Sequence, residues 1–114
     1  MKKIISFAMA TLILASALLA QEAKIIETEF KVFGNCGMCK TRIEKAVKIK
    51  EVKYAKWNKD TKMLKVAFES TIDADSLHKR VAEVGHDTEK FKANDEVYAA
   101  LPKCCLYRDN PKTH

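Results

Sequence analysis

The sequence predicts an α+β domain in which an antiparallel four-stranded sheet carries two helices on one face, followed by a short C-terminal helical tail. Segments with a two-residue apolar period and segments with a helical period follow one another in the order β-α-β-β-α-β. The connections between them are short and polar. The 114 residues, of which 47% are hydrophobic and 32% charged, suffice for one globular domain.

The first predicted strand covers residues 24–33. Its apolar side chains, among them Phe30 and Val32, share one face and alternate with charged residues, as in a half-buried strand. Gly34 and Asn35 end this pattern.

A first helix is predicted to begin at Cys39, because Cys39, Ile43 and Val47 recur at helical spacing. Its remaining faces are basic and form either a solvated surface or a docking surface for an acidic partner domain. The basic residues of this helix are Lys40, Arg42, Lys45 and Lys48.

Residues 52–57 and 63–69 predict the two strands of a β-hairpin around the polar turn 58–61. The alternation of apolar and polar residues is clearest in the second of these strands.

The second helix is predicted to begin after Asp73, a good N-cap residue, and to end before Gly85, which tolerates a positive φ. Residues 86–92 predict a weaker last strand, in which Phe91 is the only strongly apolar residue. His78, in the second helix, and the terminal His114 are expected to be exposed to solvent.

These six elements fit the ferredoxin-like βαββαβ sandwich. In that topology the loop after the first strand and the loop after the second helix lie at the same end of the sheet. Cys36, Cys39 and His86 are therefore predicted to be neighbours.

Beyond this domain, residues 94–101 predict a short helix that Pro102 ends, and the vicinal pair Cys104 and Cys105 follows. The helix rises about 12 Å and four extended residues add about 13 Å. A six-residue strand is ~20 Å long, so the tail can return to the end of the sheet that carries Cys36.

Residues 1–20 predict a signal peptide, because Lys2 and Lys3 precede an uncharged run that ends in small residues. A transmembrane anchor is the alternative, at the short limit of spanning length. Cleavage leaves a domain at residues 21–93 and a tail at 94–114. The mature protein is expected to be periplasmic or secreted and to make no contact with a membrane. The formal net charge then falls from +6 to +4. The chain lacks the basic, aromatic-bearing stripe of a nucleic-acid-binding protein.

The four cysteines form two local pairs, Cys36 with Cys39 and Cys104 with Cys105. In an exported chain of this size, two structural disulfides are the default interpretation. Local spacing, however, is typical of metal and redox sites. A helix N-terminus favours the thiolate, and paired thiolates select soft ions such as Cu(I), or bind Zn(II).

The chain resembles the heavy-metal-associated domain family, which includes small copper chaperones, the metal-binding modules of copper-transporting ATPases and the periplasmic mercury-binding protein. The resemblance covers about residues 25–91 and is carried by Val32-Phe33-Gly34-Asn35-Cys36-Gly37-Met38-Cys39, by residues 42–47 and by Val84-Gly85-His86-Asp87. It implies a non-enzymatic carrier or buffer in which Cys36 and Cys39 bind one soft ion almost linearly. Cu(I) is expected first, with Hg(II) or Zn(II) as alternatives, and a metal-transporting ATPase as a partner.

One departure concerns the support of the loop. The family usually has Gly-Met-Thr or Gly-Met-His before the first cysteine, with the methionine packed under the loop, where this chain has Phe33, Gly34 and Asn35. Met38 is expected to supply the missing apolar contact in preference to a thioether contact with the ion.

Three further residues are candidate ligands. His86 is either a third ligand or donor to the thiolates, or a loop residue in the place of an aromatic one. Cys104 and Cys105 either complete a four-sulfur site, which favours Zn(II) or a small Cu(I) cluster, or stay outside it.

Two other functions are alternatives to metal binding. Cys36-Gly37-Met38-Cys39 differs by one residue from the Cys-Gly-Pro-Cys of thioredoxins, which indicates a thiol-disulfide oxidoreductase. That fold needs more sequence before its motif and a cis-proline opposite it, and no proline lies between Cys36 and Pro102. The other alternative is a structural, disulfide-bonded exported domain.

Overall fold

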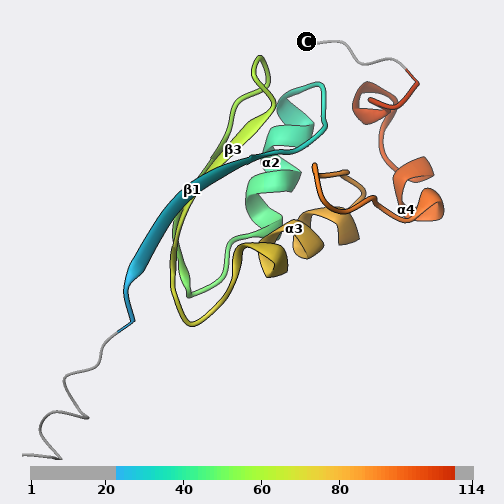
Figure 1. The fold of residues 1–114 in the computed structure, drawn as a ribbon. Coiled ribbons are helices and arrows are strands. Elements are labelled where there is room, and N and C mark those ends of the chain that lie inside the picture. The colour runs from blue at the N-terminus through green and yellow to red at the C-terminus, as the bar shows by residue number, and fades with distance from the viewer. Residues whose placement is uncertain (1–22, 110–114) are drawn as a thin grey trace, which may run out of the picture.

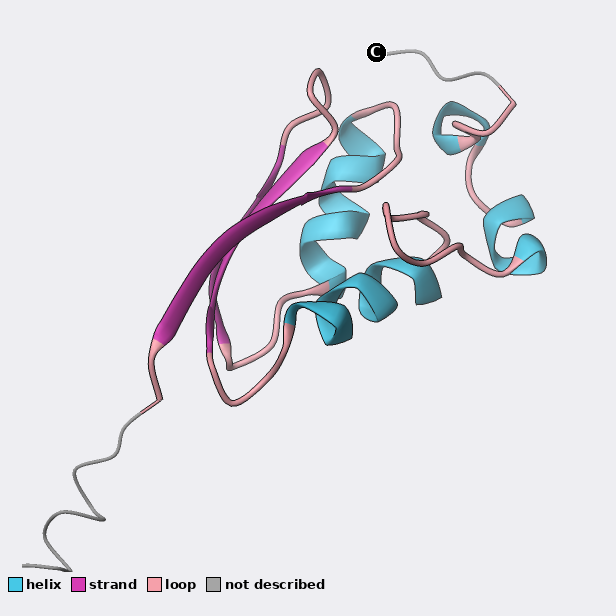
Figure 2. Ribbon diagram, in the orientation of Figure 1, coloured by secondary structure: helices cyan, strands magenta, loops and turns pink. Residues whose placement is uncertain are grey.

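The structure, a computed structural model, describes residues 23–109, and the predicted signal peptide lies outside them. The predicted α+β class is confirmed (Figures 1 and 2). No helix in the described part of the chain is long and apolar enough to cross a membrane. The elements are β1 (Ile25–Lys31), α2 (Gly37–Ala46), β2 (Val52–Trp57), β3 (Met63–Glu69), α3 (Ala74–Glu83), α4 (Asp95–Ala99) and the 3-10 turn η1 (Lys103–Cys105).

The sheet is antiparallel with the strand order β1-β3-β2, so the predicted hairpin is confirmed as the pair β2 and β3. Phe30 of β1 lies opposite Leu64 of β3, which in turn lies opposite Trp57 of β2. Helices α2 and α3 cover one face of the sheet (Figure 1). The core between the layers is formed by Phe30, Ile43, Val47, Leu64, Val66, Phe68, Leu77 and Val81.

The predicted fourth strand, residues 86–92, is wrong, because the described sheet has three strands. Only Thr88 makes a bridge, to Val32. The Thr88 Oγ1 accepts hydrogen bonds from the backbone N–H groups of Lys90 and Phe91 at 3.2 and 3.0 Å. These bonds turn the chain back after Thr88. Residues 87–89 bond to the end of β1 only briefly, through the Phe33 N–H to the Asp87 carbonyl at 2.9 Å and the Glu89 N–H to the Lys31 carbonyl at 3.1 Å, which is too short a pairing to form a strand.

The first helix begins at Gly37, two residues before the predicted start at Cys39. Cys36 is its N-cap residue and has an extended backbone. Cys39 consequently lies in the first turn and faces the core. In α3 the predicted cap is confirmed, since Asp73 Oδ1 accepts the backbone N–H of Ser76 at 2.9 Å.

The expectation that His78 is exposed is wrong, because only 3% of this residue is accessible. Its Nδ1 lies 2.7 Å from Thr88 Oγ1, and its ring stacks on Phe30 with 3.7 Å between centroids. Burial, and then the positive charge of Lys90, lower the pKa of His78. The buried stripe of α3 is thus wider than its aliphatic residues alone indicate.

Candidate metal centre

A buried tryptophan supports the loop between β1 and α2. Trp57 is 1% exposed, and its Nε1 donates a hydrogen bond to the Val32 carbonyl at 2.9 Å. A Cβ on Gly34 would lie 3.1 Å from the Trp57 ring and 3.1 Å from the Cys39 Cβ. The Gly34 backbone can therefore pack this closely against both residues only because glycine has no side chain. Trp57 therefore lies beneath the loop, next to the position at which the related family has its methionine.

The sulfurs of the other three cysteines gather around that of Cys36. Its Sγ lies 3.0 Å from that of Cys104, 3.4 Å from that of Cys39 and 3.5 Å from that of Cys105. The sulfurs of Cys104 and Cys105 are 3.8 Å apart. All four residues are free thiols, so the structure contains no disulfide between them.

Two segments far apart in the chain bring these sulfurs together. Cys36 and Cys39 come from the start of α2, whereas Cys104 and Cys105 come from η1, which lies against α2. The tail thus returns to the loop end of the sheet, as the lengths of its segments permit. Among the described residues, the thiol sulfurs of Cys36, Cys104 and Cys105 all lie within 4.8 Å of one another.

Hydrogen bonds favour ionisation of one thiol. Burial raises the pKa of Cys36, but hydrogen bonds with Cys104, Cys39 and Cys105 outweigh burial and lower it to about 7. The hydrogen bond with Cys36, followed by burial, raises the pKa of Cys104. Burial raises that of Cys105 further, although Arg42 Nη1 lies 3.3 Å from its Sγ and opposes the rise. The thiolate form is therefore favoured at Cys36 over Cys104 and Cys105.

Met38 does not make the predicted apolar contact. It is 53% exposed, and its Sδ lies 3.7 Å from the Cys104 Sγ, which donates to it. The expectation that Met38 packs under the loop is therefore wrong, and Trp57 is the residue that sequence reasoning missed. The sequence feature that could have indicated this role is the large apolar side chain at the end of the predicted strand 52–57.

His86 lies beside the loop, as the topology predicted, but not within the sulfur group. Its Nδ1 is 2.8 Å from the Phe33 carbonyl, which can only accept, so Nδ1 carries the proton. Its Nε2 is buried and has no hydrogen-bond partner in the described chain. The ring stacks on Tyr107 with 5.5 Å between centroids. His86 is thus neutral and held by the Phe33 carbonyl and the Tyr107 ring.

Burial lowers the pKa of His86 to about 4, against a smaller upward effect of the hydrogen bond to Phe33. A depressed folded-state pKa adds stability above the unfolded value, near 6.5, and this contribution is lost as the pH falls toward 4. We expect the free energy of unfolding, measured with urea, to fall about 3 kcal/mol more between pH 7 and pH 4 in the wild type than in His86→Phe. His78 is present in both proteins, so its titration does not contribute to the difference between them. An equal fall in the free energy of unfolding in the two proteins would contradict the prediction.

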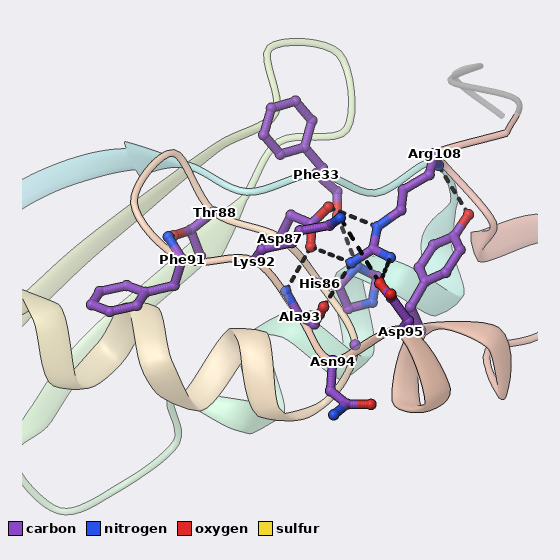
Figure 3. A network of polar contacts seen from close by, with 12 residues as sticks. Phe33, His86, Asp87, Thr88, Phe91, Lys92, Ala93, Asn94, Asp95 and Arg108 are labelled. Atoms are coloured by element: carbon purple, nitrogen blue, oxygen red, sulfur yellow. Dashed lines mark hydrogen bonds and ion pairs between the residues drawn. The ribbon is translucent and has the colours of Figure 1, made fainter.

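An arginine anchors the tail to the domain (Figure 3). Arg108 Nε and Nη2 donate to the two carboxylate oxygens of Asp87 at 2.9 and 2.7 Å, and Nη2 also donates to the Ala93 carbonyl at 2.8 Å. The guanidinium lies 4.2 Å from the centre of the Tyr98 ring. Tyr107 donates its hydroxyl to the Gly85 carbonyl at 2.7 Å. These contacts fix the segment that carries Cys104 and Cys105.

The three-stranded sheet, its two covering helices and the cysteine loop at one end define a small α+β fold. Comparison with solved structures bears this out. The CopZ metallochaperone superposes with a TM-score of 0.53 at 23% identity, covering 55% of this chain and 98% of that protein. A protein of Bacillus anthracis str. Ames described as copper-ion-binding gives 0.56 at 21% identity, covering 60% and 100%.

The water-soluble region of the P-type ATPase CopA from Bacillus subtilis gives a TM-score of 0.53 at 21% identity, covering 60% of this chain and 47% of that one. No family model and no curated protein sequence matches the chain. The predicted resemblance to the heavy-metal-associated domain is therefore confirmed at the level of the fold.

Proposed function

We propose that the protein carries or buffers a soft metal ion, Cu(I) first, with Hg(II) or Zn(II) as alternative cargo. The observation that carries the proposal is the convergence of three other thiols on the Cys36 Sγ, within 3.5 Å. Thiolates are the ligands that soft ions select, and none of these sulfurs is committed to a disulfide. The similar folds of two copper proteins, CopZ and the Bacillus anthracis protein, support the same conclusion.

The spacing of the sulfurs suits a shared ion. Two thiolates bound at about 2.3 Å with tetrahedral angles lie ~3.8 Å apart. The distances from Cys36 are 3.0 to 3.5 Å, so the thiols need to separate by less than about 1 Å to admit an ion. We therefore include Cys104 and Cys105 with Cys36 and Cys39 in the site. Arg42, beside Cys105, offsets part of the negative charge of the thiolates.

Burial of the motif weighs against the two other functions. A thiol-disulfide oxidoreductase must expose its attacking sulfur to a partner disulfide, but Cys36 is 7% exposed and Cys39 is fully buried. Two structural disulfides need the four sulfurs to divide into two separate pairs. Here one sulfur contacts the other three, which supports a shared site over two separate pairs.

We also propose that the protein acts outside the cytoplasm and passes its ion to an acidic metal-transport domain, such as that of a metal-transporting ATPase. The charged start and apolar run of residues 1–20 support export. On α2, Lys40 pairs with Glu44 and Arg42 contacts Cys105, so these two are engaged within the chain. Lys45 and the following Lys48 line an open groove, where a partner carboxylate can reach them.

Native mass spectrometry of the reduced protein tests the proposal, with Cu(I), Zn(II) and Hg(II) in competition. We expect the wild type to bind Cu(I) in preference to Zn(II). In the double variant Cys104→Ser/Cys105→Ser, the pair Cys36 and Cys39 still holds one Cu(I), but Zn(II) affinity falls by about 100-fold because a closed zinc site needs four ligands. A wild type that binds none of the three ions would refute the function. Unchanged stoichiometry and affinities in the double variant would remove the tail from the site.

A further inference from the structure

The exposed thioether of Met38 continues the sulfur group out to the protein surface. Met38 is the second residue of α2 and leaves 53% of its surface accessible. Its sulfur nevertheless has a defined neighbour, the Cys104 Sγ at 3.7 Å. A methionine that served only to fill space would be covered by apolar side chains.

The sulfurs are graded in exposure from solvent to core. From Met38 the successive sulfur-sulfur distances are 3.7 Å to Cys104, 3.0 Å on to Cys36 and 3.4 Å to Cys39. Exposure falls along the same path, from 53% at Met38, through a half-buried Cys104, to 7% at Cys36 and none at Cys39. Each step is short enough for one ion to bind both sulfurs before it leaves the first, since two sulfurs on one ion lie ~3.8 Å apart.

On the basis of the proposed function, we infer that Met38 is the outer ligand of the site, at which Cu(I) or another thioether-binding soft ion is taken up and released. A thioether is neutral and needs no deprotonation, so it binds an incoming ion without releasing a proton. The ion then exchanges Met38 for Cys104 and the buried sulfurs, whose thiols release their protons to solvent as they bind it. Thioether sulfur is a ligand for Cu(I), whereas zinc sites are built from thiolate, imidazole and carboxylate. Met38 thus selects the ion at the surface.

The variant Met38→Leu tests this role, because it keeps the size and apolar character of an exposed side chain and leaves the fold intact. Met63→Leu, at the start of β3, is the matched control. We expect Met38→Leu to slow the transfer of Cu(I) to a competing chelator roughly tenfold and to leave Zn(II) affinity unchanged. Met63→Leu should match the wild type in both measurements.

NMR of protein labelled with 13C at the methionine methyl groups gives a second readout. We expect Cu(I) to shift the Met38 methyl signal, assigned from its loss in Met38→Leu, and to leave that of Met63 in place. Zn(II), bound by the same thiols, should shift neither. If the wild type binds no Cu(I), the proposed function itself fails. If it binds Cu(I) while the Met38 signal and the transfer rate stay unchanged, the function stands and the role of Met38 is refuted.

Discussion

Replacement of Cys36 by serine is expected to lower Cu(I) affinity by more than about 100-fold, because loss of even an outer-shell partner costs 10–100-fold in metal sites and Cys36 is the shared central sulfur. Its Sγ is the one that Cys39, Cys104 and Cys105 all approach within 3.5 Å. Without it, only the three thiols of Cys39, Cys104 and Cys105 remain. The measurement is a competition titration of the reduced protein against a Cu(I) chelator.

The serine substitution leaves the helix intact, which makes the result interpretable. Cys36 is the N-cap residue of α2 and makes no side-chain cap hydrogen bond, whereas serine is among the preferred N-cap residues. A matched variant is Cys104→Ser, which removes a peripheral sulfur and should reduce affinity less. Equal Cu(I) affinity in Cys36→Ser and wild type, with unchanged circular dichroism, would show that the site is elsewhere.

Replacement of Trp57 by alanine is expected to reduce the free energy of unfolding by about 4 kcal/mol, the cost of removing a large buried aromatic side chain. Trp57 is 1% exposed and fills the space beneath Gly34 and Cys39. The variant also loses the hydrogen bond from Nε1 to the Val32 carbonyl. Denaturation with urea, followed by circular dichroism, measures the change.

Tyr54, on the same strand β2, is the control for this prediction. It is 50% exposed, so Tyr54→Ala should change stability by no more than about 0.5 kcal/mol. The more conservative Trp57→Phe keeps a ring but lacks the donor, and should fall between the two. A cost for Trp57→Ala as small as that for Tyr54→Ala would show that the tryptophan does not support the loop.

Local patterns predicted the hairpin and the second helix well, because their determinants are neighbours in the sequence. The predicted strand bounds 52–57 and 63–69 agree with β2 and β3, and Asp73 caps α3 as expected. The fourth strand failed for the opposite reason. The side chains of Asp87 and Thr88 find partners that no local pattern reveals, namely Arg108 in the tail and the backbone of the following turn.

The predicted topology also placed the loop after the first strand beside the loop after the second helix. It therefore placed His86 beside the segment that carries Cys36 and Cys39. The contacts that complete the site did not follow. The support from Trp57 and the anchoring by Arg108 depend on long-range packing, and Met38 was expected under the loop because methionine more often fills gaps. The depth of each sulfur, on which the path from Met38 inward depends, is a property of the folded surface.

The return of the tail to the loop has a consequence for the order in which the molecule is made. The sulfurs of Cys36 and Cys104, which touch in the structure, are 68 residues apart in the chain. When Cys104 leaves the ribosome, the whole sheet and both covering helices have already been synthesised. The scaffold is therefore synthesised before the tail that completes the sulfur group. Because the core between the sheet and the helices is built largely from apolar side chains, we expect the metal-free protein to keep its fold, unlike small zinc modules that unfold when the metal is removed.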